Sequence, residues 1–475
     1  MHPRWLAPAV LALLFVSGCL GAANDEPSSS GSPANGAPEP VVPPQPDFDF
    51  STVIQPDHGA HEVAALHTAG HGLTQVGYTS IQELLPLGVR GSITQVDVQG
   101  DWAVVSGMEG GLAFVLVDLS DPTDPVATSW YPSAADGWTA RLSEDGNYVF
   151  YGCQMLGATG DVTATVRGTC EDPTAIHAPS TSNPAGVVVV DVRDKTNPKF
   201  VDFLATGGSH NIQYAFIGGV DTIFTSAVTI LTFDRTAGEL TQVADVPGRH
   251  DATLARHPTT GQWLLLTGTG ELSIYNVDNP ADPQMLFEGT SDMGWTGWHE
   301  QTVVPQLVDG KFVVVLAGES FVGTGDLTGA EGSSLPDTIF IADITDPANP
   351  TLLGSWQPPL DPRLPWVSYL YSVHEIAATP TGQVAIAWYH GGVWVLDIST
   401  EERQISPVTL AVFQPHEEMT ALPPSTFAQV PVPVVPFVWG TGWHRSGHLI
   451  VPDMHTGLYV LEPAWGLHPG GEGGA

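Results

Sequence analysis

Histidine is the residue type in this chain with the greatest capacity for chemistry, because four histidines recur at equivalent places in consecutive sequence repeats. Each precedes an acidic or amide residue and then an apolar segment, as in SHNIQ, RHDAT, WHEQT and VHEIA; the four are His210, His250, His299 and His374. Two others lie in the strings YHGG and MHTG, at His390 and His455. Imidazoles that converge near carboxylates are suitable ligands for copper, zinc or iron. These six histidines are therefore the candidate metal ligands.

A structural role is the alternative for the same histidines. A repeat inherits its residues, and each imidazole could hydrogen-bond the backbone of the neighbouring repeat as a latch. The spacing is not a compact HxH or HExxH motif, so it is less specific than a true metal signature. The chain contains no GxSxG, P-loop or Rossmann fingerprint, and no Ser/His/Asp set has sequence support.

The elements that must position these histidines come from a repeat that runs through most of the chain. Its unit is an alternating apolar strand, an acidic residue and a proline turn, as in FVLVDLSDPTDP (114–125), VVVVDVRDKTNP (187–198) and IFIADITDPANP (339–350). Seven copies can be aligned on one position: Asp118, Asp191, Asp234, Asn276, Asp343, Asp397 and Glu462. Seven copies of a four-strand unit with a shortest spacing of about 42 residues predict an all-β, seven-bladed β-propeller.

The last copy lacks an outer strand of its own, and the segment upstream of the first copy supplies a candidate. Leu73–Ser80 has the pattern of an outer strand, much as Thr351–Trp356 has in the fifth copy. Such a strand would complete the last blade and close the ring, which removes an exposed sheet edge.

The repeat strings resemble the LVIVD repeat of exported prokaryotic β-propeller proteins, many of which are lipoproteins. The resemblance covers roughly residues 90 to 462 and implies the propeller fold. It implies no particular activity, since fold does not fix function.

Blade topology predicts that one face of the propeller is elaborated. Turns between strands a and b, and between c and d, are short and share one face, the plain face. The long insertions 153–185, 320–337 and 414–436 fall in connections on the opposite, looped face. All six candidate histidines belong to the looped face, with the four strand-start histidines around the central channel. Elaborated loops on a rigid scaffold commonly carry binding sites.

The N-terminus predicts export and lipid anchoring. An apolar run from Leu6 to Val16 resembles the core of a signal peptide and ends in the lipobox-like string VSGC. Cys19 would then be the lipidated first residue of the mature protein; an ordinary secretory signal with a chance cysteine is the alternative. We expect a signal peptide with lipobox at 1–19, a Pro/Ser/Gly-rich tether with a His-containing segment at 20–72, the propeller at 73–466 and a flexible tail at 467–475.

The two remaining cysteines, Cys153 and Cys170, lie within one insertion. In an oxidising compartment they are expected to form a disulfide, with a pair of free thiols as the alternative.

The net charge of the chain limits the classes of partner that it can bind. The chain has 51 acidic and 14 basic residues, a net charge of −37, which would repel nucleic acid. We therefore expect a cell-surface lipoprotein, held at the membrane by its lipid, that binds an extracellular ligand or protein through its looped face. The alternative is a metal-dependent enzyme, copper being one option, centred on the histidines at the central channel.

Overall fold

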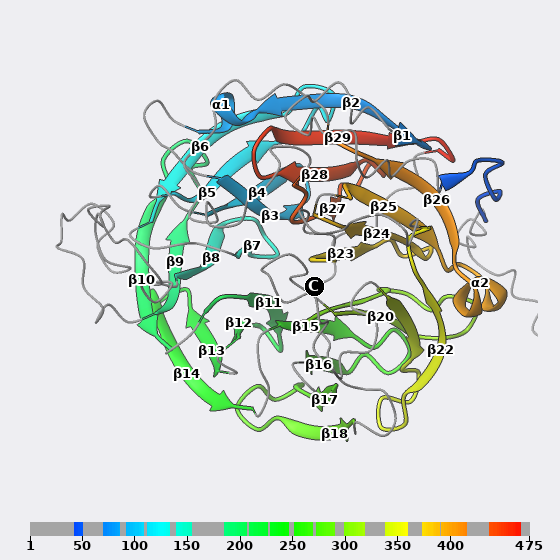
Figure 1. The fold of residues 1–475 in the computed structure, drawn as a ribbon. Coiled ribbons are helices and arrows are strands. Elements are labelled where there is room, and N and C mark those ends of the chain that lie inside the picture. The colour runs from blue at the N-terminus through cyan, green and yellow to red at the C-terminus, as the bar shows by residue number, and fades with distance from the viewer. Residues whose placement is uncertain are drawn as a thin grey trace, which may run out of the picture. The chain divides into compact units, whose positions relative to one another are not determined.

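The computed structural model describes most of the repeat region. Its described residues are 42–50, 70–85, 92–108, 112–133, 139–153, 185–206, 209–226, 229–246, 251–268, 272–289, 299–318, 338–359, 373–389, 391–415 and 437–466. Residues 42–475 form one compact unit. Seven antiparallel sheets surround a common axis in this unit (Figure 1). The prediction of an all-β, seven-bladed propeller is confirmed.

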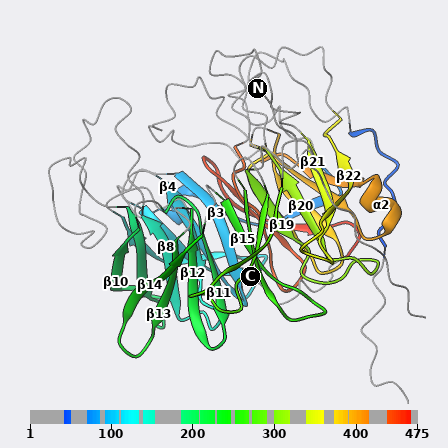
Figure 2. The same cartoon turned by 90° about the horizontal axis from the view of Figure 1, so that it is seen from below.

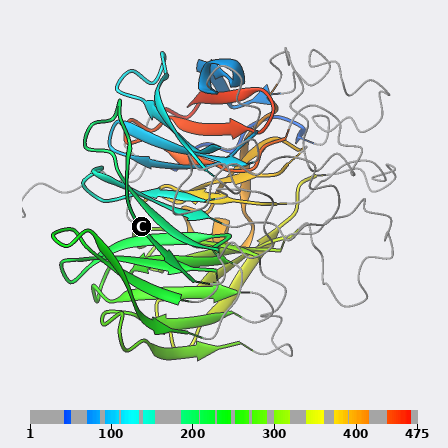
Figure 3. The same ribbon diagram turned by 90° about the vertical axis from the view of Figure 1, so that its left-hand side faces the viewer.

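Each blade orders its strands from the axis to the rim, and the strands run between the two faces of the disc (Figures 2 and 3). Blades one and two contain β3 (Ser92–Gln99), β4 (Trp102–Met108), β5 (Leu112–Asp118), β6 (Val126–Pro132), then β7 (Ala140–Leu142), β8 (Tyr148–Cys153), β9 (Gly186–Asp191) and β10 (Lys199–Ala205). Blades three and four contain β11 (Ile212–Ile217), β12 (Val220–Thr225), β13 (Thr229–Asp234), β14 (Glu239–Asp245), then β15 (Asp251–Arg256), β16 (Trp263–Gly268), β17 (Ser273–Asn276) and β18 (Gln284–Glu288).

The later blades follow the same order with additions at the rim. Blades five and six contain β19 (Glu300–Val303), β20 (Val313–Ala317), β21 (Ile339–Asp343), β22 (Thr351–Trp356), then β23 (Ile376–Ala378), β24 (Gln383–Ala387), β25 (Val393–Asp397) and β26 (Val408–Phe413). Blade seven contains β27 (Gly442–Trp443), β28 (Leu449–Asp453) and β29 (Gly457–Pro463). Two short helices, α1 (Ile81–Leu84) and α2 (Glu401–Ile405), lie near the rim (Figure 1).

The N-terminal segment closes the ring as predicted. Strand β2 (Leu73–Ser80) pairs antiparallel with β29 as the outer strand of blade seven, with Tyr78 opposite Tyr459. The short β1 (Gly70–His71) adds a fifth strand to blade six by pairing with β26. Thr79 also donates from Oγ1 to the carbonyl of Pro125 in blade one, 2.5 Å away. The first and last blades are therefore joined through this strand.

The repeated aspartate makes the short turn between strands c and d possible. In blade one, Oδ1 of Asp118 accepts from the Ser120 amide at 2.8 Å, and Oδ1 of Asp121 accepts from the Thr123 amide at 3.0 Å. Such side-chain turns satisfy backbone donors locally. Equivalent residues accept the same bond in other blades: Asp191, Asp234, Asn276, Asp343 and Asp397.

The outer strands share a second repeated feature, a register shift against strand c in every blade, with a second such shift in blade one. A β-bulge increases the local twist of a strand. Each bulge therefore adds local twist at the rim of its blade.

The hydrophobic core is divided among the blade interfaces. Seven clusters of buried apolar side chains lie one between each pair of adjacent blades, including the pair formed by blades seven and one. The largest fully buried side chains, Trp388 and Trp394, belong to the cluster between blades five and six. Burial of this kind is the main stabilising contribution to a sheet-on-sheet contact.

Part of the segment predicted to be a tether packs against blade six. We call residues 42–50 the strap. Phe50, which is 8% exposed, joins the core cluster that contains Trp394. The Pro43 carbonyl accepts from Nη1 of Arg403 at 2.7 Å, and Arg403 lies in α2.

Candidate functional site

Three of the four strand-start histidines lie within the described residues, each just before the inner strand of its blade. His299 directly precedes β19, and His374 lies two residues before β23, so both stand at the channel end of the inner strands of blades five and six. His210 has the same position before β11; it is half-buried, and its carbonyl accepts from Oγ1 of Thr139 at 3.1 Å. His250 and His390 lie outside the described residues.

His299 and His374 are brought together. Their ring centroids are 5.2 Å apart, and both residues are buried. Nδ1 of His374 lies 3.2 Å from the carbonyl oxygen of Trp439 in blade seven. Because a carbonyl only accepts, this nitrogen carries the hydrogen. His374 thus makes the inter-blade bond of the latch hypothesis.

Aromatic rings extend from this pair toward the last candidate histidine. We call His299, His374, Tyr389, Phe437, Trp439 and His455 the channel-mouth cluster. The ring centroids of His374 and Trp439 are 4.2 Å apart, those of Tyr389 and Phe437 are 5.0 Å apart, and those of Phe437 and His455 are 5.6 Å apart. Of the six candidates, the structure therefore connects His299, His374 and His455 through a continuous set of buried rings.

The backbone at this cluster is held in an unusual conformation. Tyr389 is fully buried and has a φ angle of 35°. This is a backbone conformation that residues other than glycine seldom adopt. Single bridges link Val438 to Tyr389 of blade six and to Asp453 of blade seven. Strained residues persist where the surroundings fix them, and such positions are common at functional sites.

Asp453 fixes the loop that carries His455. It is fully buried, and Oδ2 accepts from the Phe437 amide at 2.5 Å. Oδ1 accepts from the amides of His455 and Thr456, both at 3.0 Å, and from Oγ1 of Thr456 at 2.9 Å. The carboxylate thus sets the positions of both Phe437 and His455.

Polar groups are buried beside the cluster. Glu300 and Glu375 are 9% and 7% exposed. A Cβ on Gly440 would lie 2.9 Å from Oε2 of Glu375 and 2.9 Å from Cα of Gln95, so only glycine fits between them. The amide of Gln301, next to Glu300 and 0% exposed, has no hydrogen-bond partner for either its oxygen or its nitrogen in the described structure.

Metal ligation receives limited geometric support. Within the described residues, no three histidine, cysteine, aspartate or glutamate side chains come close enough together to hold a metal ion. His299 and His374 supply two imidazoles, and a third ligand would have to come from residues outside this set, such as His250 or His390. The six-histidine metal site stays a prediction.

The cysteines are described only in part. Cys153 ends β8 in the interface between blades one and two and is disulfide-bonded. Cys170 and Cys19 lie outside the described residues, so the predicted pairing and the predicted lipid anchor stay predictions. The described part of the chain contains no helix long and apolar enough to cross a membrane.

Other histidines cap turns at the plain face. His444 and His448 flank the a-to-b turn of blade seven, and Oγ of Ser446 lies 2.6 Å and 2.7 Å from their Nδ1 atoms. The Ser446 amide donates to Nδ1 of His444 at 3.3 Å, so that nitrogen is unprotonated. Burial lowers the pKa of both imidazoles below the usual value. The Nδ1 atoms of both residues therefore take part in hydrogen bonds within the local turn, whereas the buried Nε2 of His444 has no hydrogen-bond partner in the described structure.

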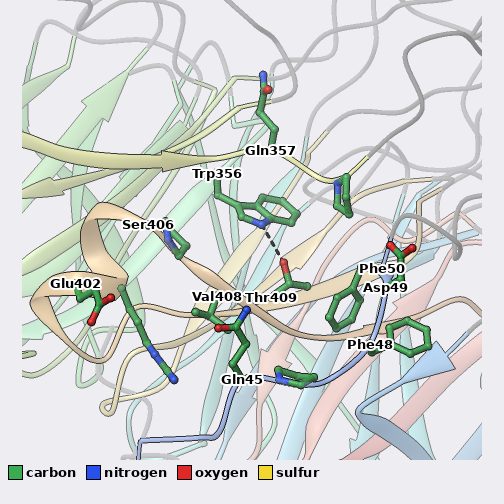
Figure 4. Close-up of a pocket in the computed structure, with 14 residues that line it drawn as sticks. Gln45, Phe48, Asp49, Phe50, Trp356, Gln357, Glu402, Ser406, Val408 and Thr409 are labelled. Carbon is green, nitrogen blue, oxygen red and sulfur yellow. Dashed lines mark hydrogen bonds between the residues drawn. The ribbon is translucent and has the colours of Figure 1, made fainter.

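A pocket at the rim was not predicted from the sequence. It has a volume of about 570 Å³ and lies between the strap, the end of β22, and α2 with the start of β26 (Figure 4). The strap had been assigned to the tether because of its prolines, although Phe48 and Phe50 were a signal that it packs. We call this cavity the rim pocket.

Comparison with known proteins identifies the repeat. Residues 90–132 match the family model of the LVIVD repeat, and these residues form blade one. Blade one is an LVIVD repeat. No curated protein sequence matches the chain. Among solved structures the chain is similar to one described as "Crystal Structure of Mitotic Checkpoint Complex", with 9% identity, a TM-score of 0.48, and coverage of 82% of this chain and 95% of that chain.

Proposed function

We propose that this LVIVD-repeat propeller is an exported lipoprotein, anchored at the cell surface through Cys19, that binds a small ligand at the channel-mouth cluster. The observation that carries the proposal is the Gln301 amide, which is fully buried, two residues after His299 in the chain, and without a partner in the described structure. A buried amide without partners costs free energy, and native proteins keep few such groups. A ligand that hydrogen-bonds Gln301 would recover that cost.

The chemistry of the site favours a ligand that is positively charged or rich in hydrogen-bond donors. The carboxyl groups of Glu300 and Glu375 are buried beside the channel-mouth cluster. Aromatic faces such as that of Trp439 attract cations. The net charge of −37 draws cations toward the protein and disfavours nucleic acid as a partner.

A metal-dependent enzyme is the second candidate, favoured by one observation. His374 donates from Nδ1 to a backbone carbonyl, which is the arrangement that orients Nε2 of a metal-bound histidine. Copper, zinc or iron would suit imidazole ligands.

Two measurements on the purified protein test these candidates. Native mass spectrometry should detect a bound small molecule that is lost in Gln301→Leu and kept in Gln284→Leu, a control at the exposed rim of blade four. Elemental analysis should separately show stoichiometric metal, lost in the variant His299→Gln with His374→Gln, if the second candidate is correct. Equal ligand content in Gln301→Leu and the control would contradict the proposed site.

The anchor is tested independently of the ligand. Cys19→Ala should move the protein from the membrane fraction to the soluble fraction, because the lipid on Cys19 is its proposed attachment. Unchanged membrane association would show that Cys19 is not the anchor.

A further inference from the structure

We propose that the rim pocket is a second binding site, distinct from the channel mouth, and that it takes an extended peptide segment carrying a lysine or arginine. The pocket's volume of about 570 Å³ is within the range of ligand sites. Its walls come from the outer parts of blades five and six, whereas the channel-mouth cluster starts at their inner strands.

The shape and lining of the pocket suit an extended chain. Figure 4 shows Trp356 at its centre, with Phe48 and Phe50 to one side and Glu402 to the other. Nε1 of Trp356 donates to Oγ1 of Thr409 at 3.0 Å, and the residue is 8% exposed, so the pocket meets only a small part of the indole. Three prolines complete the wall: Pro46, Pro359 and Pro407. Aromatic side chains interleaved with prolines form the grooves that bind extended, proline-containing peptides in other proteins.

Arg403 supplies recognition of a peptide carbonyl. Its Nη1 donates to the buried carboxylate of Asp397 and to the Pro43 carbonyl of the strap. A guanidinium has five N–H donors, and Nε and Nη2 of Arg403 make no hydrogen bond to the described residues. The strap carbonyl shows how this rim holds an extended chain. A ligand carbonyl in the pocket would accept from the remaining donors.

The charge of the pocket selects a basic side chain. Glu402 and Asp49 line it and are exposed, while the positive charge of Arg403 is paired with Asp397. The pocket thus has an excess of negative charge, in a protein whose net charge is −37. A lysine or arginine side chain on the ligand would complement the Glu402 carboxylate.

The chain's own proline-rich segment is a poor occupant. Residues 24–41 contain Asp25, Glu26 and Glu39 and no lysine or arginine. Repulsion between like charges disfavours this segment, from the same or a second molecule. The favoured ligand is therefore a basic segment of a different protein.

Fluorescence anisotropy with two labelled hexapeptides tests the proposal. Acetyl-PKPPKP-amide should bind the full chain, and acetyl-PEPPEP-amide should bind about tenfold more weakly or not at all. Glu402→Gln should weaken binding of the basic peptide by about threefold, and the effect should shrink in high salt. Arg403→Lys keeps the charge but loses the planar donors, so it should weaken binding by about tenfold.

Matched variants make the result decisive. Glu401→Gln changes a residue of the same helix that does not line the pocket, and it should bind like the unmodified protein. Gln301→Leu should also bind the peptide normally, which separates this site from the channel mouth. The proposal is overturned if neither peptide binds, if both bind equally, or if Glu402→Gln has no effect. Binding of maltohexaose without binding of either peptide would assign the pocket to a carbohydrate and equally overturn it.

Discussion

The inner strands of the propeller carry histidines at both ends, and the two ends differ in how the fold satisfies polar groups. At the plain face, Nδ1 of His257 accepts from the amides of Thr259 and Thr260 at 3.2 Å and 3.3 Å, and Nε2 lies 3.0 Å from the Thr345 carbonyl in blade five. At the channel mouth, the buried amide of Gln301 has no partner in the described structure. Within the described residues, the His257 imidazole at the plain face has a partner at each nitrogen and the Gln301 amide at the channel mouth has none, although Nε2 of His444 at the plain face also lacks a partner.

Equivalent turns in other blades show that the plain-face histidines have a structural role. Oγ of Ser143 accepts from the Asn147 and Tyr148 amides in blade two, and Oγ1 of Thr379 accepts from the Gln383 amide in blade six. A hydroxyl therefore replaces imidazole at the same turn position. A role that serine, threonine and histidine all fill is that of a hydrogen-bond acceptor, with no requirement for imidazole chemistry.

The first prediction has the largest expected effect and concerns Asp453 at the channel mouth. It tests whether this part of the protein is rigid although some of its buried polar atoms have no hydrogen-bond partner in the described structure. Asp453→Asn replaces one carboxylate oxygen by a donor that faces backbone amides, so it should lower the free energy of unfolding by about 3 kcal/mol. Urea denaturation measures this change. A loss below about 1 kcal/mol would show that the loop carrying His455 is held by other contacts.

The second prediction compares two buried glutamines at opposite ends of the strands. Gln383 lies at the plain face, where its amide is bonded to Thr379, Thr381 and Asp397. Gln383→Leu should lower the free energy of unfolding by about 2 kcal/mol, because it leaves those partners unsatisfied. Gln301→Leu should raise it by about 1 kcal/mol, because it removes an amide without a partner.

The free energies of unfolding of both variants should be measured by denaturant unfolding under the same conditions, without added ligand. If both substitutions destabilise the protein equally, the Gln301 amide is satisfied in solution and the contrast between the two ends fails.

The third prediction concerns pH. Burial lowers the folded-state pKa of His444 and His448, Arg445 lowers that of His444 further, and Asp101 and Glu462 act in the opposite direction. Below the unfolded pKa of about 6.5 the unfolded chain binds more protons than the folded chain at these residues. Their contribution to stability is thus complete above about pH 6.5 and is lost as the pH falls through the folded-state values.

A double variant isolates this pH dependence. His444→Asn with His448→Gln should flatten the stability profile between about pH 5 and 6.5 by roughly 1 kcal/mol. The His257→Asn variant is the comparison, since it removes a turn cap in a different blade. An unchanged slope in the double variant would assign the acid sensitivity to other groups.

Sequence alone predicted the propeller because its determinants are local and repeated. The sheets could be predicted from the strand pattern and from the turn aspartates such as Asp118. The closure by Leu73–Ser80 could be predicted because the last repeat has no outer strand of its own. The repeat also predicted a common register for the strand-start histidines, and His210, His299 and His374 each lie just before an inner strand. In contrast, the packing of Trp439 and Phe437 against His374 joins segments far apart in sequence through single bridges, which no repeat specifies.

The strap is a segment whose composition did not reveal a tertiary contact. Its prolines indicated an extended chain, and the chain is extended, but Phe50 inserts into a core and the Pro43 carbonyl meets Arg403. Extended conformation is local, whereas docking depends on a surface built by blades five and six. The rim pocket was therefore beyond prediction from the strap's own residues.

The smallest expected effect is at the repeated aspartate of the plain face. Asp118→Asn should change the free energy of unfolding by less than about 0.5 kcal/mol, because an amide oxygen can accept the bond that the carboxylate accepts from Ser120. Blade four already contains this substitution, since Oδ1 of Asn276 accepts from the Asp278 amide at 2.8 Å. Asp118→Ala removes the acceptor and should cost about 1 kcal/mol, by analogy with loss of a helix cap. Thermal unfolding of both variants, compared with Asp453→Asn, measures how differently one residue type is used at the two ends. A loss for Asp118→Asn as large as that for Asp118→Ala would mean that the negative charge, and not the hydrogen bond, is what this turn requires.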